Sequence, residues 1–194
     1  MLSILVFMAF AYIVGSIPSG VVVARLLGAP DPREVGSGNI GATNVSRAAG
    51  KGAGLATLAA DLSKGALPTC IAMHATGGRP LAVTLTGLAA MAGHLYPLFL
   101  RFKGGKGVAT AAGVVAVISP SVLLFDVAVF VVVAALTRYV SLASLAAAAA
   151  LPGFFLVTAG KLPYVPFGVA AAAAVAARHS ANIKRLLEGR ENRL

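Results

Sequence analysis

The chain has 194 residues, of which 58% are hydrophobic and only 11% are charged, and its mean hydropathy is +0.89. A composition this apolar excludes a soluble globular domain and indicates a polytopic membrane protein, which we take as a single domain over residues 1–194. The net charge of +10 alone would suit a nucleic-acid partner, but the basic residues lie between apolar segments and form no soluble basic face, so we expect no nucleic-acid binding.

Seven apolar segments approach the roughly 20 residues that a membrane-spanning helix needs. In chain order they are Leu2–Arg25, Gly54–Ala75, Pro80–Leu100, Gly107–Ile118, Ser121–Leu136, Leu142–Thr158 and Tyr164–Leu187. The sequence therefore predicts an all-α protein with seven transmembrane helices. The segment Gly15–Gly20 contains a proline and predicts a kink or break in the first helix, and Ser119-Pro120 is expected to separate the fourth helix from the fifth.

The basic residues are distributed unequally between alternate connections. One side receives Arg25, Arg33, Arg47, Lys51, Arg101, Lys103, Lys106, Arg138, Arg178, Lys184, Arg185, Arg190 and Arg193. Only Arg79 and Lys161 fall on the other side. Because cytoplasmic loops are enriched in Lys and Arg, this distribution predicts an N-terminus outside the cell and a C-terminus in the cytoplasm. No Lys or Arg precedes Arg25, so we interpret the first segment as a retained span and not as a cleaved signal peptide.

The connection after the first span contains an unusual polar segment, Gly36–Arg47. Its glycines allow successive backbone N–H groups to turn inward around an anion, and the hydroxyl and amide side chains add uncharged hydrogen bonds. The guanidinium of Arg47 matches the geometry of a phosphate. We favour an anion site at the membrane face over a flexible linker. The candidate ligands in this segment are Gly36, Ser37, Gly38, Asn39, Gly41, Thr43, Asn44 and Arg47.

A second polar segment, His94–Thr110, contains a glycine-rich turn with two lysines that opens into a helix. Backbone N–H groups at a helix start, the helix dipole and a nearby ammonium all favour an anion, so we predict a phosphate-binding loop. The candidate residues are His94, Lys103, Gly104, Gly105, Lys106 and Gly107. The segment is not a Walker A loop, because Gly107 stands where that motif requires Ser or Thr. A basic loop lying on anionic lipid headgroups remains the alternative.

Three weaker features complete the polar inventory. His179 and Asn182 are three residues apart on one face of the last helix, where they suit either a site or a solvated helix end. Asp61 and Lys64 are a charged pair inside the second span, and we interpret them as a structural brace that satisfies itself. Ser144, at a helix junction, is a further candidate ligand.

Metal-dependent chemistry has no support in the sequence. It contains no H-E-x-x-H motif, no carboxylate cluster suited to Mg²⁺ and no G-x-S-x-G elbow. Cys70 is the single cysteine, which excludes a disulfide framework and a cysteine-based metal site. We therefore predict a metal-independent protein without a cofactor.

Four separated segments, in order, resemble the bacterial acyl-phosphate:glycerol-3-phosphate acyltransferases, the PlsY family: Gly15–Gly20, Gly36–Arg47, His94–Thr110 and Arg178–Glu191. The resemblance covers nearly the whole chain. It implies a multi-pass enzyme of the bacterial cytoplasmic (inner) membrane that performs the first acylation of phospholipid synthesis. Such an enzyme moves a fatty acyl group from acyl phosphate to the sn-1 hydroxyl of glycerol 3-phosphate, giving lysophosphatidic acid and inorganic phosphate, without acyl-CoA.

The resemblance also assigns roles to individual residues. It implies essential functions for Ser37, Arg47, His179 and Asn182, phosphate binding by Gly104–Gly107 and a structural role for Glu191. The implied partners are the two substrates, membrane lipid and a soluble enzyme that produces acyl phosphate, and we expect the protein to act as a monomer.

Several alternatives remain open at this stage. Either phosphate-friendly loop could hold either substrate, and the proton of the hydroxyl could pass to a histidine or to the donor phosphate itself. A small transporter of anionic solutes is the competing class, although the polar groups gather at one membrane face and not at the midplane. A phosphatidyltransferase with a CDP-linked donor would need metal-binding aspartates that the sequence lacks.

Overall fold

A computed structural model describes residues 2–193, and all regular structure in that range is helical. The chain divides into two compact units, the first ending at Val114 and the second beginning at Val115. The predicted all-α class is therefore confirmed for the described residues.

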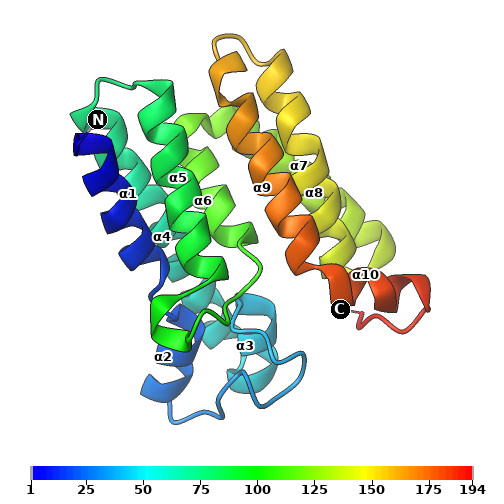
Figure 1. The fold of residues 1–194 in the computed structure, drawn as a ribbon. Helices are drawn as coiled ribbons and strands as arrows, with labels where there is room; N and C mark the ends of the chain where they lie inside the picture. Colours follow the sequence, from blue (N-terminus) through cyan, green and yellow to red (C-terminus); the bar gives the residue numbers. More distant parts are fainter. Residues whose placement is uncertain (1, 194) are drawn as a thin grey trace. The chain divides into compact units, whose positions relative to one another are not determined.

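The first unit is built around three long helices. Its elements are α1 (Leu2–Gly15), α2 (Ser19–Leu26), α3 (Ala42–Ala49), α4 (Lys51–Ala75), α5 (Pro80–Leu95), the 3-10 helix η1 (Leu98–Leu100) and the start of α6 (Val108–Ile118). Helix α1 packs against α4 and α5, and α4 also carries the short helices α2 and α3. Within this unit, α2, α3 and the loop that leads into α6 lie at one end, opposite the α4–α5 connection (Figure 1).

The predicted break in the first span is confirmed. Helix α1 ends at Gly15 and α2 begins at Ser19. Pro18 has no N–H with which to continue the helical ladder, and the Ile17 N–H closes a tighter bond to the Val14 carbonyl at 3.2 Å. The break leaves the Ile17 carbonyl outside regular helix, where a side chain from another element can bond to it.

Small residues allow the helices of this unit to touch through their backbones. A Cβ on Gly15 would overlap the backbone of Ala90, which brings α1 against α5, and a Cβ on Gly65 would overlap the backbone of Thr110, which brings α4 against α6. Close approach at small residues is the usual way in which membrane helices pack, because lipid provides no hydrophobic force that drives helices together. These glycines therefore hold α5 and α6, and the loop between them, close to α1 and α4.

The second unit contains α7 (Pro120–Thr137), α8 (Val140–Val157), the 3-10 helix η2 (Leu162–Tyr164), α9 (Val165–Arg178) and α10 (Ser180–Leu187). Helix α8 packs between α7 and α9, and the rings of Phe155, Tyr164 and Phe167 form an aromatic cluster between α8 and the start of α9. The predicted boundary before α7 is confirmed, because Ser119 caps that helix by accepting the Val122 N–H at 3.4 Å.

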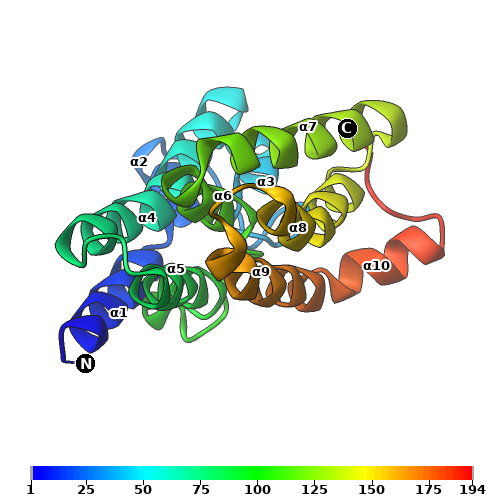
Figure 2. The same cartoon turned by 90° about the horizontal axis from the view of Figure 1, so that it is seen from above.

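The seventh predicted span, Tyr164–Leu187, is wrong as one continuous helix. Helix α9 ends at Arg178, and α10 turns away from its axis (Figure 1), although the two follow each other nearly in line when seen from above (Figure 2). His179 lies between them, and its N–H bonds to both the Val175 and the Ala176 carbonyls, which tightens the last turn of α9. Beyond this point the sequence becomes polar and basic, so α10 lacks the apolar surface that would extend a membrane span.

Four stretches of the described chain are long and apolar enough to cross a membrane: Leu2–Leu26, Pro80–Leu100, Pro120–Thr137 and Val140–Val157. Two further apolar helices, Val108–Ile118 and Leu162–Arg178, are shorter. Helix α4 carries Asp61 and Lys64 and falls outside this group. The count of seven spans and the orientation of the termini stay predictions.

Candidate functional site

The loop between α2 and α3 is organised by the side chain of Asn44, which is only 2% exposed. Its Oδ1 accepts the Ser37 N–H at 2.9 Å. Its Nδ2 donates to the carbonyls of Pro32 at 2.7 Å, Asn39 at 2.9 Å and Val35 at 3.1 Å. The amide is thus engaged with the backbone of its own loop, and these contacts support a loop-shaping role for Asn44. The ligand role predicted for it stays a prediction.

Two glycines are required by this loop. Gly36 has φ +59°, and a Cβ there would overlap Oδ1 of Asn44. Gly20, on α2, lies against the Ile40 carbonyl with no room for a Cβ. A side chain at either position would therefore displace the loop from Asn44 or from α2.

The outer face of the same loop carries the groups expected to meet an anion. Ser37, Gly38, Thr43 and Arg47 are exposed. Asn39 Oδ1 accepts the Gly41 N–H at 2.8 Å and turns the chain into α3. The loop therefore combines a fixed interior with an exposed hydroxyl and guanidinium surface.

Arg33, by contrast, is engaged with a carboxylate of its own segment. Its Nε donates to Asp31 Oδ1 at 2.9 Å, and the backbone N–H of Arg33 bonds to the same oxygen at 2.9 Å. The side-chain hydrogen bond from Arg33 lowers the pKa of Asp31 below its ordinary value, so this carboxylate stays ionised and offsets the Arg33 charge. Arg33 is accordingly a suitable control for Arg47.

The glycine-rich loop before α6 is folded tightly onto the end of α5. The Gly105 N–H donates to the His94 carbonyl at 3.1 Å. A Cβ on Gly104 would overlap that carbonyl, and a Cβ on Gly105 would overlap Nε2 of the His94 ring. Gly107, with φ +82°, turns the chain into α6, which begins at the next residue. The predicted glycine turn opening into a helix is therefore confirmed, and His94 contacts it through both its carbonyl and its ring.

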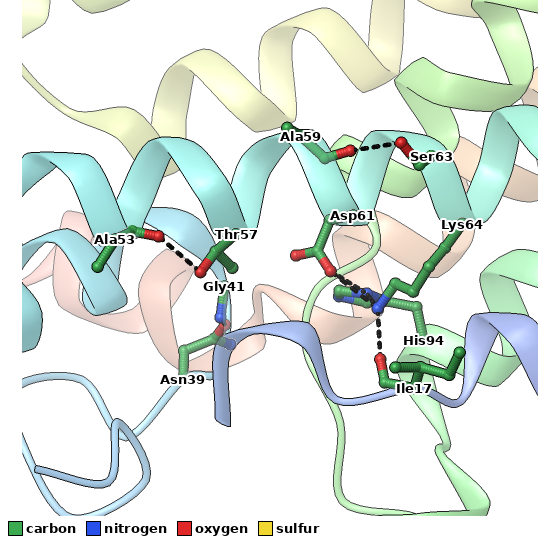
Figure 3. A network of polar contacts seen from close by, with 10 residues as sticks. All are labelled: Ile17, Asn39, Gly41, Ala53, Thr57, Ala59, Asp61, Ser63, Lys64 and His94. Atoms are coloured by element: carbon green, nitrogen blue, oxygen red, sulfur yellow. Dashed lines mark hydrogen bonds and ion pairs between the residues drawn. The ribbon is translucent and has the colours of Figure 1, made fainter. Parts of the chain in front are cut away.

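Behind this loop lies a buried polar network, drawn in Figure 3. The ammonium of Lys64 lies 2.8 Å from Asp61 Oδ1, 2.9 Å from the Ile17 carbonyl and 3.0 Å from His94 Nδ1. The side chains of Asp61 and Lys64 are 4% and 5% exposed, and His94 is 4% exposed. The predicted pairing of Asp61 with Lys64 is confirmed, but the pair does not stand alone, because it also binds the helix break and the histidine.

The network fixes the protonation of His94. An ammonium has three donors and no acceptor, and all three donors of Lys64 have a partner. His94 Nδ1 must then accept, so the neutral ring carries its proton on Nε2, the nitrogen that lies against Gly105. Sequence reasoning missed this link because His94 is thirty residues from Lys64 and only the packing of α4 on α5 brings them together.

In the second unit, His179 has the opposite arrangement. The ring is buried, and its Nδ1 lies 2.8 Å from the Val175 carbonyl. A carbonyl can only accept, so Nδ1 carries the proton and Nε2 is the lone-pair nitrogen of the neutral ring. His179 is therefore arranged as a base or acceptor, whereas His94 is arranged as a donor.

Asn182 and the chain terminus are joined by Glu191. Its carboxylate accepts from Asn182 Nδ2 at 2.6 Å and from Arg185 Nε at 2.7 Å. Burial opposes ionisation of Glu191, but the hydrogen bonds from Asn182 and Arg185 outweigh it and lower the pKa of Glu191. These contacts support the structural role expected for Glu191, which orients Asn182 on α10.

Two other predicted residues lie apart from these contacts. Ser144 is buried and its hydroxyl donates to the Val140 carbonyl at 2.8 Å, which is the usual bond of a serine to its own helix. Lys103 is exposed on the loop before α6.

In the described residues, no three His, Cys, Asp or Glu side chains gather as a metal site. Metal independence stays a prediction.

Comparison with known proteins gives a consistent result. The profile of the family described as glycerol-3-phosphate acyltransferase matches residues 5–189. Proteins of that name from Syntrophotalea carbinolica and Geobacter sulfurreducens are each 48% identical over 193 residues, covering 100% of this chain and 98% of the relative. The protein of that name from Aquifex aeolicus is 47% identical over 184 residues, which cover 95% of this chain and 95% of the relative.

Two crystal structures also match. Both are of PlsY (YgiH), described as an integral membrane glycerol 3-phosphate acyltransferase. Its glycerol 3-phosphate form superposes with a TM-score of 0.94 at 46% identity, over 99% of this chain and 96% of that one. Its lysophosphatidic acid form gives a TM-score of 0.93 at 45% identity, over 99% and 95%.

Proposed function

This chain belongs to the glycerol-3-phosphate acyltransferase family, and on that premise we propose that it transfers a fatty acyl group from acyl phosphate to the sn-1 hydroxyl of glycerol 3-phosphate. The products are lysophosphatidic acid and inorganic phosphate. The observation that carries the proposal is the match over 99% of the chain to a solved relative named in glycerol 3-phosphate and lysophosphatidic acid forms. We propose that this protein acts as a single-domain monomer and needs no cofactor, metal or acyl-CoA.

The chemistry of the donor suits a protein that offers binding loops and no covalent nucleophile. An acyl phosphate is a mixed anhydride with phosphate as its leaving group, so positioning and charge stabilisation can suffice. The hydroxyl oxygen attacks the carbonyl carbon, the bond from that carbon to the phosphate oxygen breaks, and phosphate leaves. Both substrates carry a phosphate, and the first unit has two loops shaped for an anion.

We assign the loops as follows. The Gly36–Asn39 segment holds the acyl phosphate, while Arg47 and Lys106 bind the phosphate of the acceptor. Within this segment the Ser37 N–H is donated to Asn44 Oδ1 and the Gly38 N–H to the Val35 carbonyl, so the Ser37 hydroxyl is the group that we assign to the acyl phosphate. On the sequence resemblance, we assign His179 and Asn182 to the acceptor as well. The fixed interior of the Asn44 loop supports the first assignment, because it leaves Ser37 on the exposed face. The reverse assignment of the two substrates is the alternative that kinetics must exclude.

The hydroxyl proton needs an acceptor, and the tautomers distinguish the two candidate histidines. His94 accepts at Nδ1 from Lys64 and carries its proton on Nε2, so it has no lone pair to offer. His179 donates from Nδ1 to the Val175 carbonyl and keeps the lone pair on Nε2. We therefore propose His179 as the base among the histidines, with the donor phosphate as the competing proton acceptor.

We place the protein in the bacterial cytoplasmic membrane with seven helices crossing it, its N-terminus outside and its C-terminus in the cytoplasm. Helix α3, which carries Arg47, and the loop into α6, which carries Lys106, lie at one end of the first unit, whereas the α4–α5 connection, which contains Arg79, lies at the other end (Figure 1). A cytoplasmic basic end would also face a soluble enzyme that supplies acyl phosphate. We base this orientation on the positive-inside rule, by which the end of a membrane protein richer in Lys and Arg faces the cytoplasm.

The test uses the purified protein in detergent with palmitoyl phosphate and glycerol 3-phosphate, in the presence of a strong chelator. Stoichiometric release of phosphate and formation of lysophosphatidic acid are expected. Arg47→Ala should abolish both, whereas Arg33→Ala, which removes an exposed cation already paired with Asp31, should retain them. Absence of product from demonstrably folded protein would overturn the proposal, and activity that requires added metal would overturn its metal-free form.

A further inference from the structure

We propose that Lys64 is a positioning residue for the glycine-rich loop, because its bond to His94 Nδ1 fixes the imidazole against Gly105 and so sets the position of the loop. The ligand of that loop is the phosphate of a substrate, an assignment that rests on the function proposed above. The link from Lys64 to the loop runs through His94.

The first step concerns the geometry around the ammonium. The three groups that Lys64 binds come from three different places: Asp61 on its own helix, the Ile17 carbonyl in the break between α1 and α2, and His94 near the end of α5. Because each donor has one partner, the ammonium cannot move toward one without leaving another. Lys64 is therefore held at a fixed point between three elements.

The second step leads from His94 to the loop. The His94 carbonyl accepts the Gly105 N–H, and Nε2 of its ring occupies the space where a Gly105 side chain would lie. One glycine is thus held by both the backbone and the ring of His94. Lys106, the predicted phosphate ligand, is the next residue, so a rotation of the His94 ring changes the backbone that carries it.

The third step asks why a charge is buried here. An Asp–Lys pair three residues apart on one helix satisfies itself without the histidine or the helix break. Burying two charges is costly, and well-packed apolar residues of similar volume are often as stabilising or more so. A structural brace needs only the pairing of Lys64 with Asp61. The two additional contacts of Lys64, to the Ile17 carbonyl and to His94, both lead to segments that flank the proposed site.

The test is the double variant Asp61→Asn/Lys64→Met, which removes both charges together and leaves no buried charge unpaired. Ser63→Ala, which loses one exposed hydrogen bond on the same helix, is the matched control. We expect the double variant to keep its thermal unfolding temperature within a few degrees, while KM for one phosphate substrate rises about tenfold and kcat changes less than about threefold. Unchanged KM values for both substrates in the folded variant would overturn the proposal, as would a loss confined to kcat.

A second measurement is independent of turnover. The chain has three histidines, so ¹⁵N-labelled imidazoles can be assigned by replacing His74 and His179 individually. In the wild type we expect the neutral His94 ring to carry its proton on Nε2. In the double variant we expect a mixture of the two tautomers and faster hydrogen exchange of the Gly105 amide. A wild-type His94 protonated on Nδ1 refutes the positioning role. If the wild type shows this tautomer but forms no lysophosphatidic acid, the proposed function fails while the Lys64–His94–Gly105 linkage stands.

Discussion

Replacing Asn44 with aspartate tests whether the loop between α2 and α3 depends on one side chain. The substitution conserves shape and keeps an oxygen that can accept the Ser37 N–H. It replaces the amide NH₂, which donates to the carbonyls of Pro32, Val35 and Asn39, with a second oxygen. Three carbonyl oxygens would then face a carboxylate oxygen in a buried space.

The magnitude follows from these contacts. The NH₂ group has two hydrogens, so two net hydrogen bonds worth about 1 kcal/mol each are lost. Leaving buried acceptors without donors adds roughly 1–3 kcal/mol. The expected loss of stability for the loop is therefore about 3–5 kcal/mol. The free energy of local loop opening usually lies at the low end of a protein's stability range, so this loss exceeds what normally keeps such a loop closed. The loop should therefore open while the helices stay folded.

Two assays measure this effect together. Acyl transfer from palmitoyl phosphate should fall at least about a hundredfold, and the Ser37 amide should exchange with solvent about tenfold faster or more, because about 1.4 kcal/mol corresponds to a factor of ten. The thermal unfolding temperature should move by only a few degrees, and Ser63→Ala should match the wild type in every respect. An Asn44→Asp protein that keeps more than about a tenth of the activity with a protected Ser37 amide would refute the reasoning.

Three further changes have defined outcomes. Gly105→Ala should lower kcat/KM more than about tenfold because its Cβ would overlap the buried histidine ring, whereas Gly52→Ala, with open space around it, should be neutral. His179→Asn keeps a donor for the Val175 carbonyl but removes Nε2, so transfer should be lost in a folded protein; turnover that is merely weakened would favour the donor phosphate as base. Burial raises the pKa of Glu191, but hydrogen bonds hold it below its ordinary 4.5. Protection of the tail amides from hydrogen exchange should therefore be complete above about pH 4.5 and lost as the pH falls through the lower folded value. Glu191→Gln should remove that acid step, and an unchanged pH profile in this variant would contradict the assignment.

Local signals in the sequence predict much of this fold. The break before Ser19 follows from Pro18, and the start of α7 follows from Ser119-Pro120, because both depend on the missing N–H of proline. The two glycine-rich loops are also visible in the sequence, since Gly36, Gly38 and Gly107 adopt the positive φ angles that glycine favours and Gly104 and Gly105 leave no room for a Cβ.

The features that could not be predicted are those created by packing between distant segments. The contact of Lys64 with His94 exists only because α4 lies on α5, and nothing in the i, i+3 spacing of Asp61 and Lys64 indicates a third partner. The division between α9 and α10 at His179 was missed for a different reason: no proline or glycine marks it, and the helix ends where a histidine bonds back to the preceding turn.

The role of Asn44 explains why an amide, and not a hydroxyl or a charge, stands at the centre of the first loop. An anion is repelled by carbonyl oxygens as strongly as it is attracted by N–H groups, so a phosphate-binding loop must turn its carbonyls away from the ligand. The NH₂ of Asn44 draws the carbonyls of Pro32, Val35 and Asn39 toward the buried interior. A serine has one donor and could not bind all three, and a lysine would bring a charge into an interior with no carboxylate partner among these contacts. Three carbonyls of the loop are thereby engaged with the buried amide, which suits the anion-binding role that we propose for the face carrying Ser37.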